Sequence, residues 1–181
     1  MKLVFCSDIH GDITAAKASL DAFRREDAEK LIILGDILYH GPRNDLPKDY
    51  APKDVIALLN ENRDIILAVR GNCDTEVDQM VLDFPVLADY GYLYLDGISV
   101  IITHGHNLNT KTPPPLRRGE LLIHGHTHVL TCEKFGNSNF YLNPGSCALP
   151  KNNNPKTYMV YENRSFTVKD FEGNVLLEKR F

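Results

Sequence analysis

The sequence contains no tryptophan and only four cysteines, and these form no metal-binding or redox motif. Cys6, Cys73, Cys132 and Cys147 stand far apart, and no C-x-x-C pair exists. This spacing argues against a zinc ribbon and against a thioredoxin-type dithiol. We therefore expect four free thiols in a reducing compartment, and we interpret Cys6, Cys132 and Cys147 as small buried apolar residues.

Long apolar runs are also absent, since none approaches the roughly 20 residues that span a bilayer. Asp8, His10 and Asp12 interrupt the N-terminal run too early for the apolar core of a signal peptide. We expect a cytoplasmic protein without a membrane partner. The net charge of −4 is opposite in sign to that of a typical nucleic-acid-binding surface, so no stable nucleic-acid partner is expected. A nucleotide substrate remains compatible with this charge.

Several motifs that would fix the chemistry are missing from the sequence. There is no G-x-x-x-x-G-K-[ST] phosphate loop, no G-x-G-x-x-G after a strand, no H-E-x-x-H and no G-x-S-x-G. These absences argue against a P-loop nucleotidase, a Rossmann dinucleotide enzyme, a zincin peptidase and a serine hydrolase of the α/β-hydrolase type.

The composition that remains, 43% apolar and 24% charged, suits one globular domain over residues 1–181. Apolar runs and helical spacing alternate in the first third of the chain. Strands are predicted at 3–6, 31–34 and 65–69, and helices at 15–25 and from Pro52 onward. This order predicts right-handed crossovers and a largely parallel sheet.

Beyond a short predicted helix at 75–82, strands follow one another quickly. They are expected at 92–95, 100–103, 121–123, 130–135, 140–143, 156–161, 165–171 and 175–179. The fold class is therefore α/β with two mixed sheets. We expect the first half of the chain to build a mixed sheet and the second half to add antiparallel strands.

Polar side chains follow five of the predicted strands at the point where each strand ends. The runs end in Asp8 with His10 behind it, in Asp36, in Asn72, in His104, and in His124, His126 and His128. All seven histidines, including His40 and His106, lie in or just after these strand ends. Because ligands bind at the carboxyl ends of strands in α/β sheets, we expect these side chains to converge.

The converging donor set predicts a metal centre. Two carboxylates, several imidazoles and one amide suit Mn²⁺, Fe or Zn²⁺ better than Ca²⁺ or a structural zinc. Six or seven protein ligands are too many for one catalytic metal, but they suit two metals about 3.5–4 Å apart that share a carboxylate. Two divalent ions with two carboxylates and a bridging hydroxide carry about one net positive charge, which matches a phosphodiester or phosphoryl oxyanion.

These motifs resemble those of the calcineurin-like metallophosphoesterases, and in particular the small bacterial YfcE-type phosphodiesterases. The family pattern is D-x-H, G-D, G-N-H-D/E, a strand-terminal His and G-H-x-H. The corresponding positions here are Asp8 and His10, Asp36, Asn72 with Asp74, His104, and His126 with His128. The resemblance implies a four-layer α-β-β-α sandwich and hydrolysis of a phosphodiester.

The resemblance also implies a role for each donor. Asp8, His10 and His128 hold the first metal, Asp36 bridges, and Asn72, His104 and His126 complete the second. The metals would be Mn²⁺, with Fe, Zn²⁺ or Ni²⁺ as alternatives. A hydroxide that bridges both metals would attack phosphorus in line.

Cys73 departs from the family pattern, in which a general-acid His follows the Asn. A thiolate nucleophile is disfavoured because no general base is evident nearby, and a metal ligand is unnecessary because other residues fill the coordination. The preferred interpretation is that Cys73 lines the site without protonating a leaving group, while Asp74 orients the turn. This predicts diesterase activity above monoesterase activity.

Around the ligand positions, His40, Arg43 and His106 are candidate contacts to a small-molecule phosphodiester, with ordinary surface residues as the alternative. His124 is either a support for a ligand or a turn residue, and the "NPGS" stretch at 143–146 is a turn that could lie beside the site. The strands at 165–179 could leave an edge for a homo-oligomer. The rival function is a non-catalytic protein-binding scaffold on the same fold, similar to the retromer subunit of this superfamily.

Overall fold

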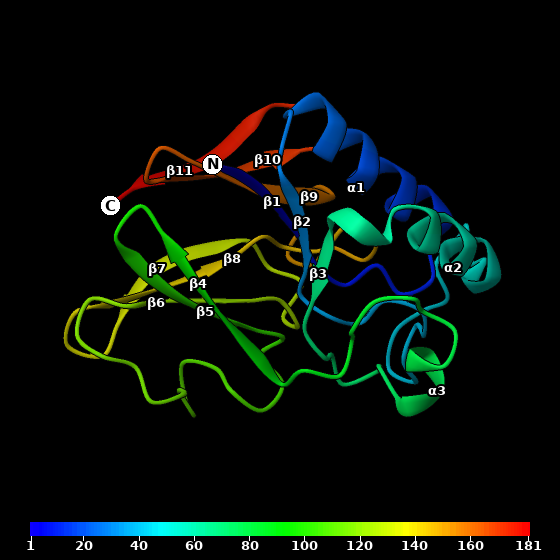
Figure 1. Ribbon diagram of the computed structural model, residues 1–181, viewed down its shortest axis with the longest axis horizontal. Coiled ribbons are helices and arrows are strands. Elements are labelled where there is room, and N and C mark those ends of the chain that lie inside the picture. The colour runs from blue at the N-terminus through cyan, green and yellow to red at the C-terminus, as the bar shows by residue number, and fades with distance from the viewer.

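The computed structural model describes residues 1–181 as two β-sheets with helices on one side (Figure 1). The helices are α1 (Ile13–Arg25), α2 (Pro52–Glu61) and α3 (Glu76–Gln79), with one 3-10 turn at Arg63–Ile65. The strands are β1 (Lys2–Cys6), β2 (Lys30–Ile33), β3 (Ile66–Ala68), β4 (Tyr90–Leu95), β5 (Ile98–Thr103), β6 (Leu121–His124), β7 (Thr131–Phe135), β8 (Asn139–Asn143), β9 (Thr157–Glu162), β10 (Ser165–Asp170) and β11 (Val175–Arg180).

The first sheet has the strand order β11-β10-β9-β1-β2-β3, and the second has β4-β5-β6-β8-β7. β1, β2 and β3 are parallel, as the alternation of strands and helices predicts. The last three strands of the chain return to this first sheet, where β9 pairs antiparallel with β1. In the second sheet β5, β6 and β8 are parallel to one another.

The first sheet is mixed, as expected, and it becomes so because the second half of the chain adds the antiparallel strands β9, β10 and β11 to it. The reason lies in β9, whose residues Thr157 to Tyr161 are all at most 5% exposed. A strand that is buried on both faces belongs in the middle of a sheet that is covered on both sides, and the free edge of β1 offers that place.

Alternation along the central strands builds two cores. Val4 and Cys6 of β1 belong to the cluster beneath α1 and α2, whereas Leu3 and Phe5 belong to the cluster between the sheets. β2 and β9 alternate in the same way. The first sheet is thus packed on both faces, which fixes the register of its strands because a slip of one residue would exchange the two faces.

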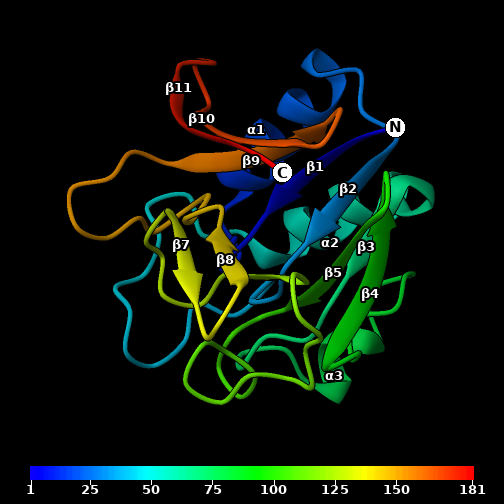
Figure 2. The same cartoon turned by 90° about the vertical axis from the view of Figure 1, so that its left-hand side faces the viewer.

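The α/β sandwich of two mixed sheets is confirmed. Figure 1 shows α1 and α2 over the first sheet, and Figure 2 shows the two sheets stacked on each other. The β5–β6 connection, residues 104–120, contains no helix. Part of it lines hollows with Tyr92 of β4 and Thr103 of β5, so this loop, and not a helix, lies against the second sheet there. No helix of the protein is long and apolar enough to cross a membrane.

Candidate metal centre

The strand-end residues come together where the two sheets meet. Asp8 and His10 follow β1, and Asp36 follows β2. Asn72 lies beyond β3, whereas His104 directly follows β5 and His126 and His128 follow β6. Both sets of parallel strands therefore deliver polar side chains to one place, as expected for the carboxyl ends of parallel strands.

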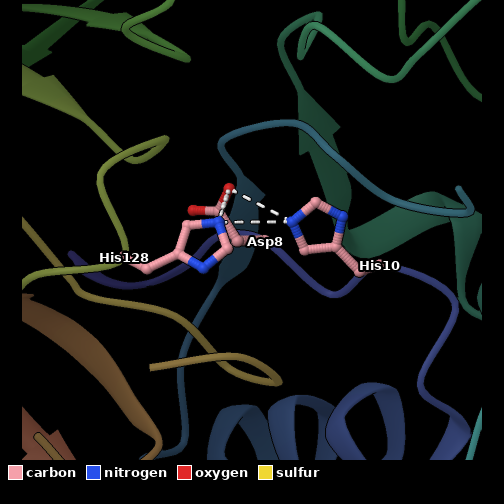
Figure 3. A group of neighbouring side chains, drawn as sticks. All are labelled: Asp8, His10 and His128. Carbon is pink, nitrogen blue, oxygen red and sulfur yellow. Dashed lines mark hydrogen bonds and ion pairs between the residues drawn. The ribbon is translucent and has the colours of Figure 1, made fainter. Parts of the chain in front are cut away.

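The first group of donors consists of Asp8, His10 and His128, all buried (Figure 3). His128 Nε2 lies 3.3 Å from Asp8 Oδ1 and 3.3 Å from His10 Nε2, and His10 Nε2 lies 3.8 Å from the same Asp8 oxygen. Asp8 Oδ1 is buried and has no hydrogen-bond partner. A buried carboxylate oxygen without a donor, facing two imidazole nitrogens, has the chemistry of a site for a cation.

The second group consists of Asp36, His104 and His126. His104 Nε2 lies 3.4 Å from Asp36 Oδ2, 3.1 Å from Asn72 Oδ1 and 3.2 Å from His126 Nδ1. Asp36 Oδ2 also lies 3.7 Å from His10 Nε2, which belongs to the first group. One carboxylate oxygen thus faces both groups of donors.

Three backbone carbonyls fix the protonation of the histidine rings. Nδ1 of His10 lies 2.8 Å from the Tyr39 carbonyl oxygen, and Nδ1 of His104 lies 2.7 Å from that of Leu34. His128 Nδ1 lies 2.6 Å from the Leu149 oxygen. Since a carbonyl can only accept, each Nδ1 carries a proton, which leaves Nε2 as the nitrogen that would bind a cation. The residues present therefore fit a pair of divalent metal ions.

Five of the donor residues adopt left-handed backbone conformations. The φ angles are 59° at Asp8, 50° at His10, 55° at Asp36, 65° at His126 and 60° at His128. Such a conformation costs a non-glycine residue roughly 1–3 kcal/mol. The surrounding hydrogen bonds hold these turns in place, for example those from the Asp8 and His10 amides to the Gly35 and Asp36 carbonyls.

Asp74 connects the strand ends that carry Asp36 and Asn72. Its carboxylate accepts hydrogen bonds from the backbone N–H groups of Gly71 (2.7 Å), Asp36 (2.8 Å) and Ile37 (2.9 Å). Burial raises the pKa of Asp74 to about 6, against the effect of these hydrogen bonds. A Cβ at Gly71 would overlap the Asp36 side chain, so the two turns approach each other too closely for any other residue. Asp74 thus positions Asp36 and does not itself belong to either donor group.

The family model of the calcineurin-like phosphoesterase superfamily domain matches residues 1–165, which include every donor described above. The chain belongs to the calcineurin-like phosphoesterases. It is 45% identical to phosphodiesterase YfcE of Escherichia coli K12 over 168 residues, which cover 93% of this chain and 91% of the relative. The solved structure of an E. coli phosphoesterase, YfcE, superposes with a TM-score of 0.95 at 42% identity, covering 99% and 98% of the two chains.

A more distant likeness extends to the structure of vacuolar protein sorting 29 from Cryptosporidium parvum. It has 16% identity and a TM-score of 0.59, and the match covers 99% of this chain and 98% of that one. At this identity the likeness concerns the fold alone. Membership of the family, together with the donor groups, places the chain among metal-dependent hydrolases of phosphoric esters.

A cavity of about 400 Å³, the metal cavity, lies over this phosphoesterase's donor groups. Its walls include Arg43 and Lys151, and Lys151 was not singled out from the sequence. Both side chains are exposed and bring positive charge to the cavity. His40 does not line the cavity, because its ring packs between Tyr39 and Tyr50, at centroid distances of 4.8 and 5.4 Å. His40 and Arg43 lie in the same loop, and nothing in the sequence indicates that only Arg43 lines the metal cavity.

Cys73 lies against both donor groups. It is buried, its backbone N–H donates to Asp36 Oδ1 at 2.8 Å, and its sulfur lies within 4.8 Å of donor atoms of His10 and Asp36. Burial, with the charge of Asp36, raises the pKa of the Cys73 thiol far above its ordinary value. A thiol with a raised pKa keeps its proton at neutral pH.

His106 and His124 lie on the other side of His126. Together with His126 they line a neighbouring hollow of about 410 Å³ and do not line the metal cavity. His124 is buried at 3% exposure, and its ring stacks on Tyr141 with centroids 4.1 Å apart. The sequence predicts His124 as a support for a ligand or as a turn residue, and it does not predict this second hollow.

Proposed function

We propose that this chain is a binuclear metal-dependent phosphodiesterase. Asp8, His10 and His128 would hold the first metal, Asp36 would bridge, and Asn72, His104 and His126 would complete the second. The observation that carries the proposal is the Asp36 Oδ2 atom, which lies 3.7 Å from His10 Nε2 and 3.4 Å from His104 Nε2. When bound, two such ions supply Lewis-acid stabilisation of the phosphoryl oxygens and activate the attacking water.

The chain's own residues would orient the ester and balance its charge. Arg43 and Lys151 stand at the metal cavity and would contact the non-bridging phosphoryl oxygens, an arrangement in which charge-assisted hydrogen bonds are strong. Asn72 would offer an amide oxygen, which binds a cation without cancelling its charge. Asp74 would keep Asp36 in place through three backbone hydrogen bonds.

The test is hydrolysis of bis(4-nitrophenyl) phosphate with added Mn²⁺. We expect activity in the wild type and at least a hundredfold loss in His128→Ala, because a ligand of the first metal is removed. Tyr94→Ala serves as a control, since this side chain is 73% exposed on β4 and outside the metal cavity. A wild-type protein that binds no metal and hydrolyses no diester would contradict the proposal and favour a protein-binding scaffold.

We further propose that diesters are hydrolysed faster than monoesters. An alkoxide leaving from a monoester depends strongly on protonation, and the Cys73 thiol is too weak an acid for this task. Matched 4-nitrophenyl mono- and diesters test the order of the two rates, and a preference for the monoester would refute it. Cys73→His should raise the monoesterase rate, whereas Cys73→Ala, which adds no acid, should not.

A further inference from the structure

The hollow next to the metal cavity has the chemistry of a binding site. We call it the side cavity and define it by His106, Lys111, His124, His126, Thr127 and Glu133. We propose that the side cavity binds a polyol substituent of the diester, such as a glycerol or sugar alcohol. This inference rests on the proposed phosphodiesterase function, because it identifies one of the two alcohol groups that are esterified to the phosphorus of the substrate.

The position of the side cavity suits one substituent of a diester. His126 and Thr127 line both the side cavity and the metal cavity, so a single wall separates them. The two hollows have similar volumes, about 410 and 400 Å³. A phosphodiester carries two substituents on one phosphorus atom. With phosphorus at the donor groups, one substituent can extend to each side of His126.

Two histidines leave a buried donor and a buried acceptor unused in this wall. His124 Nδ1 lies 3.0 Å from the Gly125 carbonyl oxygen and so carries the proton, which makes Nε2 an acceptor. His106 Nε2 lies 3.0 Å from the Asn107 amide nitrogen and so accepts, which makes Nδ1 a donor. Neither His124 Nε2 nor His106 Nδ1 has a partner. Both atoms are covered by protein. Because an unpaired buried polar atom costs about 1–3 kcal/mol, a small rotation of either ring that brings its nitrogen to the cavity and to a hydroxyl group is favoured.

The charged side chains of the side cavity also provide one donor and one acceptor. Lys111 is a donor and Glu133 an acceptor, and neither forms a salt bridge within the chain. A hydroxyl group both donates and accepts, so vicinal hydroxyls match alternating donors and acceptors. The opposite charges of Lys111 and Glu133 cancel, which disfavours a second phosphate group in this place.

The side cavity offers a nucleobase no open tyrosine or phenylalanine ring. Its apolar side chains are Val129 and Tyr141, and the Tyr141 ring is already stacked by His124 with an interplanar angle of 23°. Proteins that hold single bases stack them on free aromatic faces. A polyol therefore fits these walls better than a nucleoside.

Binding of product-like monoesters tests the assignment without reference to turnover. Titration calorimetry of the Mn²⁺-loaded protein would compare glycerol 1-phosphate with ethyl phosphate and phenyl phosphate. We expect glycerol 1-phosphate to bind at least tenfold more tightly than ethyl phosphate. Glu133→Gln and Lys111→Met should each reduce this ratio below threefold. The control is Lys134→Met, one residue along β7, whose ammonium lies over the Phe140 ring at 5.7 Å; it should keep the full ratio.

The assignment is overturned if phenyl phosphate binds more tightly than glycerol 1-phosphate, or if the advantage persists in both side-cavity variants. Diester hydrolysis separates the two proposals. A wild type that hydrolyses bis(4-nitrophenyl) phosphate but shows no glycerol preference would refute the side-cavity assignment alone. A wild type that is inert towards diesters yet keeps a glycerol preference that the variants remove would refute the phosphodiesterase and leave the polyol site standing.

Discussion

The substitution Asp74→Asn tests whether one buried carboxylate holds two strand ends together. In the wild type, Oδ2 accepts from the Gly71 and Asp36 N–H groups at 2.7 and 2.8 Å, and Oδ1 accepts from Ile37 at 2.9 Å. An asparagine oxygen can replace Oδ2, but its NH₂ group then faces the Ile37 N–H. A buried donor left without an acceptor costs about 1–3 kcal/mol, and removal of the buried charge offsets part of this. We expect a net loss of about 2 kcal/mol.

Urea unfolding of the metal-free protein measures this loss, with Asp78→Asn as the matched control. Asp78 accepts from Thr75 N at 2.6 Å and from Thr75 Oγ at 2.9 Å, but these bonds are exposed, so about 1 kcal/mol or less is expected. Because Asp74 positions the Asp36 amide, Asp74→Asn should also weaken Mn²⁺ binding at least tenfold, as loss of a residue that orients a ligand does. An Asp74→Asn protein that matches the wild type in stability and in Mn²⁺ affinity would refute the reasoning.

Three further predictions concern metal, the 143–146 turn and pH. Chelation should abolish diester hydrolysis, and Mn²⁺ should restore it and raise the melting temperature, because the ion binds only the folded chain; an unchanged melting temperature would contradict this. The Ser146 hydroxyl donates to the Asp8 carbonyl at 3.0 Å, so Ser146→Ala should destabilise the protein by about 1–2 kcal/mol and weaken Mn²⁺ binding in calorimetry, whereas Ser138→Ala should leave Mn²⁺ affinity unchanged. Burial raises the pKa of Glu26, but hydrogen bonds from Lys169 and Tyr158 lower it below its ordinary value. The ionised Glu26 carboxylate therefore stabilises the fold above the unfolded pKa of about 4.3, and this stabilisation is lost as the pH falls. Glu26→Gln should reduce the dependence of the unfolding free energy on pH between roughly pH 5 and 3. An unchanged dependence would contradict this.

The sequence predicts the donor groups well because the signal is local. Each donor lies within four positions of the end of its strand, so finding a strand also finds the donor that follows it. The fold class follows from the same alternation of elements. The family is confirmed by the match over residues 1–165, whereas the individual ligand roles stay predictions.

Long-range arrangement is the part that local pattern does not contain. β9 pairs with β1 across more than 150 positions, for example Val4 with Val160, and no residue near either strand specifies that partner. Lys151 reaches the metal cavity from a loop whose composition indicates only a turn. His40 carried the same sequence signal as the donors, yet its ring lies between two tyrosines. A single domain, a homo-oligomer and a cytoplasmic location stay predictions.

The left-handed turns at the donors set this protein's function against its stability. Five donor residues with positive φ angles together cost roughly 5 kcal/mol or more, which is comparable to the whole stability of a small domain. Glycine at any of these positions would relieve strain in the metal-free chain and remove a donor. Under selection for folding alone, random substitution would therefore remove metal donors and increase the free energy of unfolding of the metal-free chain. On this scaffold, replacing the strained donors stabilises the metal-free chain, so non-catalytic descendants are an expected outcome in a lineage released from catalysis.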